Sequence, residues 1–244
     1  MGTARAGDGF ELWYAVDGEG PAIVFPCRSQ QEHEALAAEL GASHRVVRYI
    51  PRDVPAAGWD APALDAYPTD LVVADLHAVA DAARVGEFAL GGYSGTAAMA
   101  AFLAPVSDRA TGLVAGGFPI LGPHDYWLGV LDGTRSGLVA AGQVEQARQV
   151  WLSVLLYLAW AERDDRGALR ALPGPKVAWY GGDDGEPGCA MHAGMRGSTI
   201  ARRLRAQASE LRELGFEVIE VPGHDHLGTQ QAADVVAEHL AKVL

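Results

Sequence analysis

The 244-residue sequence predicts an α/β fold in which a mostly parallel central sheet carries helices on both of its faces. Short apolar segments, typical of strands, alternate along the chain with longer segments of helical periodicity. Hydrophobic residues make up 49% of the chain, which is enough to bury the core of one domain spanning residues 1–244. There is no internal repeat, low-complexity tract or block of like charge, so we do not expect a disordered region.

The elements are expected in a regular order. Residues 11–16 and 22–25 are predicted strands, and the glycine-containing turn 17–20 between them predicts that they pair as a hairpin. Later strands are short apolar runs, and helices show one apolar face. The further predicted strands are 45–50, 88–90, 112–115, 176–180 and 216–221, and the predicted helices are 31–40, 69–85, 95–103, 198–214 and 229–243.

The segment 122–172 interrupts this alternation, because it contains two or three helical patterns with no strand between them. A run of helices inserted between consecutive strands is typical of a cap over one end of the sheet. Three aromatic side chains of this segment are candidates to line a substrate pocket, namely Trp127, Trp151 and Trp160. Two further candidates, Phe118 and Tyr93, lie outside the segment.

Composition excludes several functional classes. The formal net charge of −12 disfavours nucleic acid as a partner, because an acidic surface repels phosphates. Two well-separated cysteines, Cys27 and Cys189, are typical of reduced thiols inside a cell, and no apolar run approaches the roughly 18 residues of a membrane span. We therefore expect a cytoplasmic protein that has no membrane partner, while its oligomeric state stays open.

A candidate nucleophile lies where the strand 88–90 leads directly into the helix 95–103. Ser94 is preceded two residues earlier by Gly92 and followed two residues later by Thr96. A sharp strand-to-helix turn exposes a serine hydroxyl at the sheet edge, and it needs small residues at these two positions. The usual pattern has glycine at the second of them, so Thr96 is a departure. The helix start also directs backbone N–H groups, Gly95 first, toward developing negative charge.

With this turn, the chain resembles the α/β-hydrolase family. The resemblance extends over nearly the whole sequence and includes the strand-like segments 12–14 and 23–25, the acid loop 180–185 and the histidine loop 221–228. The family order of serine, acid and histidine implies a triad of Ser94, Asp184 and His226. Asp183 stays an alternative for the acid and His224 an alternative for the base.

The family also implies an oxyanion hole, and here the sequence departs from the common pattern. Many members carry His-Gly after the second strand, whereas this chain has Phe25-Pro26-Cys27-Arg28-Ser29. Pro26 has no N–H, so the N–H of Cys27 or of Arg28 is left to act together with that of Gly95. A thiol nucleophile at Cys27 is disfavoured, because nothing places a base beside it.

Neither a metal nor a cofactor is expected. Cys189 and His192 form a single Cys-x-x-His without a second pair, which is a weak metal signature. The sequence contains no glycine-rich nucleotide-binding loop. We thus expect a serine hydrolase of the esterase or thioesterase type, acting on a small acyl compound with an apolar part. The alternative is a non-hydrolytic member of the same fold, acting as a ligand-binding protein, lyase or cyclase.

Overall fold

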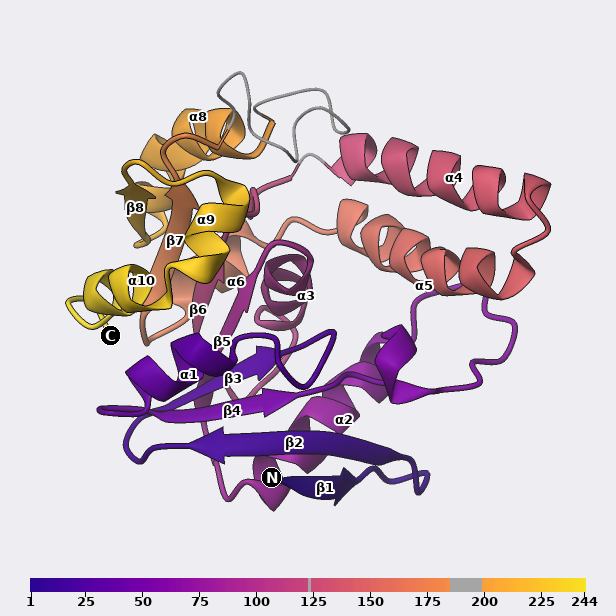
Figure 1. Cartoon of the computed structure of the whole chain (residues 1–244), viewed down its shortest axis with the longest axis horizontal. Helices are drawn as coiled ribbons and strands as arrows, with labels where there is room; N and C mark the ends of the chain where they lie inside the picture. The colour runs from indigo at the N-terminus through magenta and orange to yellow at the C-terminus, as the bar shows by residue number, and fades with distance from the viewer. Residues whose placement is uncertain (123, 185–198) are drawn as a thin grey trace.

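The computed structural model describes residues 1–122, 124–184 and 199–244, and it shows an eight-stranded sheet with helices on both faces (Figure 1). The sheet order is β1-β2-β4-β3-β5-β6-β7-β8. The strands are β1 (Gly2–Arg5), β2 (Glu11–Asp17), β3 (Ala22–Pro26), β4 (Arg45–Tyr49), β5 (Phe88–Tyr93), β6 (Ala110–Gly116), β7 (Lys176–Gly181) and β8 (Glu217–Val221). The helices are α1 (Glu34–Leu40), η1 (Pro55–Ala57), α2 (Thr69–Ala82), α3 (Gly95–Leu103), α4 (His124–Ala140), α5 (Val144–Ala161), α6 (Arg166–Ala171), α8 (Thr199–Glu213), α9 (His226–Gln231) and α10 (Ala233–Leu240).

The predicted fold class is confirmed, but the predicted hairpin of the second and third strands is wrong. β4 lies between them, antiparallel to β2 and parallel to β3. Gly18 and Gly20 explain the difference, because both adopt positive φ and lie against the turn that precedes β4. A Cβ on Gly18 would lie 2.2 Å from the carbonyl oxygen of Gly41. The turn therefore lets β4 enter the sheet instead of closing a hairpin.

Side chains of the parallel strands alternate between two cores, one on each face of the sheet. Val24, Val47 and Leu90 point to the face that α2, α3 and α8 cover. Ile23 and Trp179 point to the other face, against α1 and α10. From β3 to β8 all neighbouring strands are parallel, so their carboxyl ends share one edge, which is where the loops after β3, β5, β7 and β8 meet.

Three helices, α4, α5 and α6, follow β6 before the chain returns to the sheet at β7. α4 and α5 lie side by side and run in opposite directions beyond one end of the sheet (Figure 1). None of the helices in the described part of the chain has both the length and the apolar character needed to span a bilayer.

The last predicted helix, 229–243, is instead two helices. The chain bends at Ala232, which has φ −82° and ψ 58° and separates α9 from α10. α9 begins at His226, earlier than predicted, because the Asp225 carboxylate accepts a hydrogen bond from the N–H of Gly228 and caps the helix. His226 therefore belongs to a capped helix terminus rather than to a free loop.

Candidate active site

Ser94 occupies the tight turn between β5 and α3 in a strained backbone conformation. Its φ is 56° and its ψ is −124°, values that residues other than glycine rarely adopt. The Ser94 N–H donates to the carbonyl oxygen of Gly116 at the end of β6, at 2.8 Å. A Cβ at Gly92 would lie 2.5 Å from the carbonyl oxygen of Thr96, so the turn requires glycine there. This is the geometry that lifts a serine side chain out of the sheet edge.

Thr96 replaces the usual second glycine, and its hydroxyl is fully hydrogen-bonded. It donates to the carbonyl oxygen of Tyr93 at 2.9 Å, accepts from the Tyr93 N–H at 3.1 Å, and lies 3.1 Å from His33 Nε2. Because the hydroxyl proton goes to Tyr93, His33 Nε2 must be the donor in the last contact. The departure at Thr96 is thus accommodated by a histidine 63 residues away in the chain.

His33 was not among the predicted site residues, and it lies beside the turn through a contact with no local sequence signal. Its φ is 62°, and its ring packs against Phe25 with centroids 5.2 Å apart. Burial lowers the pKa of His33 to about 4, so the ring is neutral at pH 7. The neutral tautomer with its proton on Nε2 can make the hydrogen bond to Thr96.

Asp184 and His226 meet on the opposite side of Ser94. His226 Nδ1 lies 3.2 Å from Asp184 Oδ2, and each side chain is only 1% exposed. Two contacts with Tyr93 fix the histidine, because the Tyr93 hydroxyl donates to the His226 carbonyl at 2.8 Å and the two rings pack together, tilted by 38°, with centroids 5.0 Å apart. His226 Nε2 is buried, and no residue in the described part of the chain forms a hydrogen bond with it. With Nδ1–H directed at the carboxylate, Nε2 is left as a free base.

The histidine also lies close to the chain that holds the serine. A Cβ at Gly117, which has φ 59°, would come within 2.9 Å of His226 Cε1. Gly117 directly follows Gly116, the residue that accepts the Ser94 N–H. In the described residues, no hydrogen bond joins the Ser94 hydroxyl to His226 Nε2.

The two alternatives left open by the sequence lie elsewhere. Asp183 is exposed, and its N–H donates to the His224 carbonyl at 3.0 Å. His224 turns back on its own loop, where Nδ1 lies 2.9 Å from the Pro222 carbonyl oxygen. The structure thus brings Asp184 and His226 together and leaves Asp183 and His224 at the surface.

The predicted oxyanion donors are in three different situations. Gly95 opens α3, so its N–H has no acceptor within the helix. The Cys27 N–H is already used, because it donates to the Tyr49 carbonyl at 2.8 Å. Burial raises the pKa of the Cys27 thiol, which is consistent with an inert side chain. Cys27 is therefore unavailable as a donor, which corrects one of the two loop predictions.

Arg28 keeps its N–H directed at an acceptor from its own loop. The N–H donates to the Glu32 carboxylate, and the guanidinium holds the same carboxylate through Nη2 at 2.8 Å and Nε at 3.1 Å. The Glu32 side chain is only 6% exposed, whereas that of Arg28 is 55% exposed. The N–H of Arg28, the second predicted oxyanion donor, is therefore already occupied by the Glu32 carboxylate.

A cavity of about 340 Å³, called the front cavity below, opens at Ser94. Of the five predicted pocket residues, it includes Phe118 and Trp127, whose rings stack at 5.6 Å. Most of its remaining wall is apolar and comes from α3, α4 and α5. The lining residues are Arg28, Asp53, Val54, Ser94, Gly95, Thr96, Ala98, Met99, Phe118, Trp127, Leu131, Ser153, Leu156, Tyr157 and Ile200.

Three predicted pocket residues lie outside the front cavity. Trp160 stacks behind Phe118 at 6.0 Å and donates Nε1 to Asp165, so it supports the wall without forming it. Trp151 donates Nε1 to the Leu64 carbonyl at 3.1 Å and packs the helical segment onto the loop after β4. Tyr93 faces His226 and a second cavity. A helical period alone does not show which side of a helix faces the cavity.

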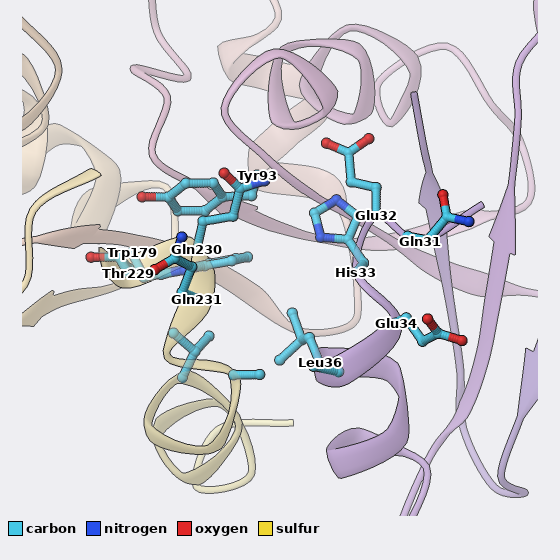
Figure 2. A pocket seen from close by; sticks show the side chains of 13 residues that line it. Gln31, Glu32, His33, Glu34, Leu36, Tyr93, Trp179, Thr229, Gln230 and Gln231 are labelled. Carbon is cyan, nitrogen blue, oxygen red and sulfur yellow. The ribbon is translucent and has the colours of Figure 1, made fainter. Parts of the chain in front are cut away.

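That second cavity, of about 330 Å³, lies between α1 and the α9–α10 pair. Figure 2 shows Gln31, Glu32 and His33 on one side of it and Tyr93, Trp179 and Gln230 on the other. Its wall is thus richer in carboxylate and carboxamide groups than that of the front cavity. Ser94 does not line it.

The described residues contain no group of three or more His, Cys, Asp or Glu side chains arranged to hold a metal ion. The pair of Cys189 and His192, which forms a weak metal signature in the sequence, lies outside the described residues.

Comparison with known proteins identifies the fold. No protein-family model matches the sequence, and no curated protein is significantly similar to it. Among solved structures, an α/β hydrolase from Sphaerobacter thermophilus is 20% identical with a TM-score of 0.60, covering 99% of each chain. An esterase from Exiguobacterium antarcticum is 16% identical with a TM-score of 0.62, and an enol-lactonase from Burkholderia xenovorans is 18% identical with a TM-score of 0.58; each covers 99% of this chain and 98% of the other. The chain has the α/β-hydrolase fold.

Proposed function

We propose that the chain is a serine hydrolase that cleaves a small carboxylic ester, thioester or related acyl compound with an apolar part. The single observation that carries this proposal is the strained Ser94 at the mouth of an apolar cavity, with the buried Asp184–His226 pair beside it. Strain in a backbone is retained where the surrounding structure imposes it, and it clusters at functional sites. Similarity to an esterase and a lactonase is consistent with this chemistry, although fold alone does not define it.

The proposed reaction begins with attack of the Ser94 hydroxyl on the acyl carbonyl. His226 Nε2 accepts the hydroxyl proton and passes it to the leaving group. Asp184 orients the imidazole through Nδ1 and stabilises the positive charge that forms on the ring when it takes the proton. Water then attacks the acyl-enzyme with His226 again as the base, and the carboxylic acid is released.

The developing negative charge on the carbonyl oxygen requires N–H donors. Gly95 supplies one from the start of α3, and Arg28 supplies the second once the Glu32 carboxylate moves off its N–H. The helices α4 and α5 contribute Trp127, Leu131 and Leu156 to the cavity. We accordingly propose that residues 122–172 act as a cap within a single domain and bind the apolar part of a small-molecule substrate.

One observation favours a second candidate function. The Glu32 carboxylate on the Arg28 N–H disfavours an oxyanion at that position, because two negative charges would compete for one donor. A non-hydrolytic member of the fold, acting as a ligand-binding protein, lyase or cyclase, would not need that donor. This alternative keeps the cavity but assigns no acyl-enzyme to Ser94.

The test is hydrolysis of chromogenic short-chain esters and thioesters by the wild type and by Ser94→Ala. The proposal expects turnover by the wild type, release of the free acid, and a loss of at least about 10³-fold in the variant. Ser153→Ala is the matched control, because Ser153 lines the same cavity without the strained turn. Equal turnover by wild type and Ser94→Ala would show that Ser94 is not the nucleophile, and no turnover in either would favour the non-hydrolytic alternative.

A further inference from the structure

Asp53 is a carboxylate in the wall of the front cavity that the proposed reaction does not use. It lies in the loop after β4, at the carboxyl edge of the sheet, and lines the same cavity as Ser94. It is the one acidic residue among those found to line this cavity. The proposed mechanism needs no second acid there, because Asp184 already partners the histidine.

Only one of its two oxygens is satisfied by the protein. Tyr67 donates its hydroxyl to Asp53 Oδ2 at 2.5 Å. Asp53 Oδ1 is buried and has no hydrogen-bond partner among the residues that the structure describes. Buried carboxylate oxygens are normally paired, so an unpaired one on a residue that lines the cavity indicates that a donor is missing from the protein.

The nearest cations cannot supply that donor. The adjacent Arg52 is committed to two other carboxylates, Asp75 through Nη2 at 2.5 Å and Asp8 through Nη1 at 2.6 Å. Arg28 lines the cavity too, but it pairs with Glu32. Within the described residues Asp53 has no ion-pair partner.

The surroundings of the Asp53 carboxyl disfavour its charged form when no ligand is bound. Burial raises the pKa of Asp53, and the charge of Asp75 adds to the increase, whereas the Tyr67 hydrogen bond, the backbone N–H of Asp53 itself and the charge of Arg52 oppose it. A donor brought by a ligand would relieve the same penalty. The rest of the nearby wall is apolar, with Val54, Met99 and Leu156.

We propose that Asp53 determines specificity by accepting a hydrogen bond from a donor group of the substrate, a protonated amine or a hydroxyl, away from the acyl carbonyl. This rests on the proposed function, because it assumes that the acyl group is held at Ser94 in the same cavity. The substrate is then an acyl compound whose apolar part ends in, or carries, one such donor. Asp53 binds and does not react.

Matched chromogenic esters test this inference. The acyl chains have equal length and end in a methyl, a hydroxyl or an ammonium group, and a series of lengths is used. For the wild type we expect kcat/KM at one or more lengths to be at least about 10-fold higher for a donor-ended chain than for the methyl-ended one. The ammonium and hydroxyl arms distinguish the two kinds of donor.

Asp53→Asn is the informative variant, because asparagine keeps the shape and still accepts the Tyr67 hydrogen bond. It should reduce the donor preference at least about 10-fold while leaving hydrolysis of the methyl-ended ester within a few-fold. Asp60→Asn is the matched control, since Asp60 is an exposed carboxylate in the same loop. No preference in the wild type would overturn the inference. An equal loss with all three esters in Asp53→Asn would do so too, since it would show a merely structural carboxyl.

A binding measurement separates this inference from the proposed function. In Ser94→Ala, which cannot form an acyl-enzyme, calorimetry compares a straight-chain amine and alcohol with the alkane-ended ether of the same length. Tighter binding of the amine or alcohol that Asp53→Asn weakens at least about 10-fold supports the site even if no ester is cleaved. Equal binding of all three, or none, overturns it even if esters are cleaved.

Discussion

The two groups proposed to act on either side of Ser94 differ in their hydrogen bonding: the acid–base pair Asp184–His226 is already in contact, whereas the oxyanion donor in the loop after β3 is not free. On one side, Asp184 and His226 are buried, in contact, and fixed further by Tyr93. On the other side, the loop after β3 directs the Arg28 N–H at the Glu32 carboxylate instead of at the cavity. In the proposed mechanism, the acid–base pair is thus already formed in the free protein and has only to engage the Ser94 hydroxyl, whereas the oxyanion side requires a change of partner.

This difference has a physical origin in the two loops. The histidine follows a short loop whose helix, α9, is capped by Asp225. The oxyanion loop carries an acid four residues after its donor, close enough for a bidentate contact with Arg28. The Glu32 carboxylate satisfies the Arg28 N–H in the free protein. It must leave this N–H before a substrate oxygen can bind there. The variants below change one side at a time.

The largest effect is expected on the base side, at the histidine. His226→Ala should lower kcat for a chromogenic ester by about 10⁴-fold or more, because no group remains to accept the Ser94 proton. His224→Ala is the control, since His224 is a histidine of the same loop with only a local contact. A large loss in His224→Ala with little in His226→Ala would reverse the assignment.

A loss of about 10³- to 10⁴-fold in kcat is expected for Asp184→Asn, because the amide can hold Nδ1 in the wrong protonation state. Circular dichroism and the unfolding transition should show that the fold survives. Asp183→Asn serves as the comparison, and its exposed side chain predicts nearly normal activity. Near-normal turnover in Asp184→Asn would instead show that the buried contact is structural.

On the oxyanion side, Glu32→Ala should raise kcat by about 10-fold, because it frees the Arg28 N–H for the developing charge. Steady-state kinetics with a small acetate ester measures this with little contribution from the apolar cavity wall that helices α4 and α5 provide. Glu39→Ala, which removes an exposed acid from the nearby helix α1, should change nothing. A fall in kcat for Glu32→Ala would mean that this acid holds the loop in its working position.

The smallest effect on activity is expected at His33, which supports the turn through Thr96. Its folded pKa of about 4 lies below the ordinary value of 6.5, so the unfolded chain binds the extra proton first as the pH falls. The contribution of neutral His33 to stability is thus fully present above pH 6.5, declines between 6.5 and about 4, and is absent below. The loss is of the order of 1–3 kcal/mol.

Chemical unfolding at pH 7 and pH 4 measures this loss. His33→Gln keeps a hydrogen-bond donor for Thr96 without a titrating ring, so its unfolding free energy should depend less on pH than that of the wild type. The same change at the half-buried His224 is the control. Identical pH dependence of wild type and His33→Gln would show that other groups cause the acid sensitivity.

The sequence predicts the parts of the site that depend on local order along the chain. The strand–serine–helix turn at Ser94 is such a part, because the small residues it needs are adjacent in sequence. The buried strands are also predictable from local order, because each is a continuous run of apolar residues. The hairpin prediction was wrong because strand order depends on β4, whose entry beside β2 is directed by contacts at Gly18 with residues 41 and 44.

Other features depend on contacts between distant segments and leave no sequence signal. His33 and Thr96 are far apart in sequence, so neither indicates the other. The Glu32 contact blocks a donor that spacing alone would leave free. Trp151 and Trp160 have the composition of pocket residues, yet their indole N–H groups bond to Leu64 and Asp165 and turn them away from the cavity.

The most direct test of the account is the rate at which a fluorophosphonate probe labels Ser94, located by mass spectrometry of the modified peptide. The probe reacts with a serine only when a base activates it. We predict fast labelling at Ser94 in the wild type, a loss of labelling in His226→Ala, and little change in His224→Ala. No labelling of the wild type, or equal labelling of Ser94 in the wild type and in His226→Ala, would contradict the claim that Ser94 is a nucleophile activated by His226.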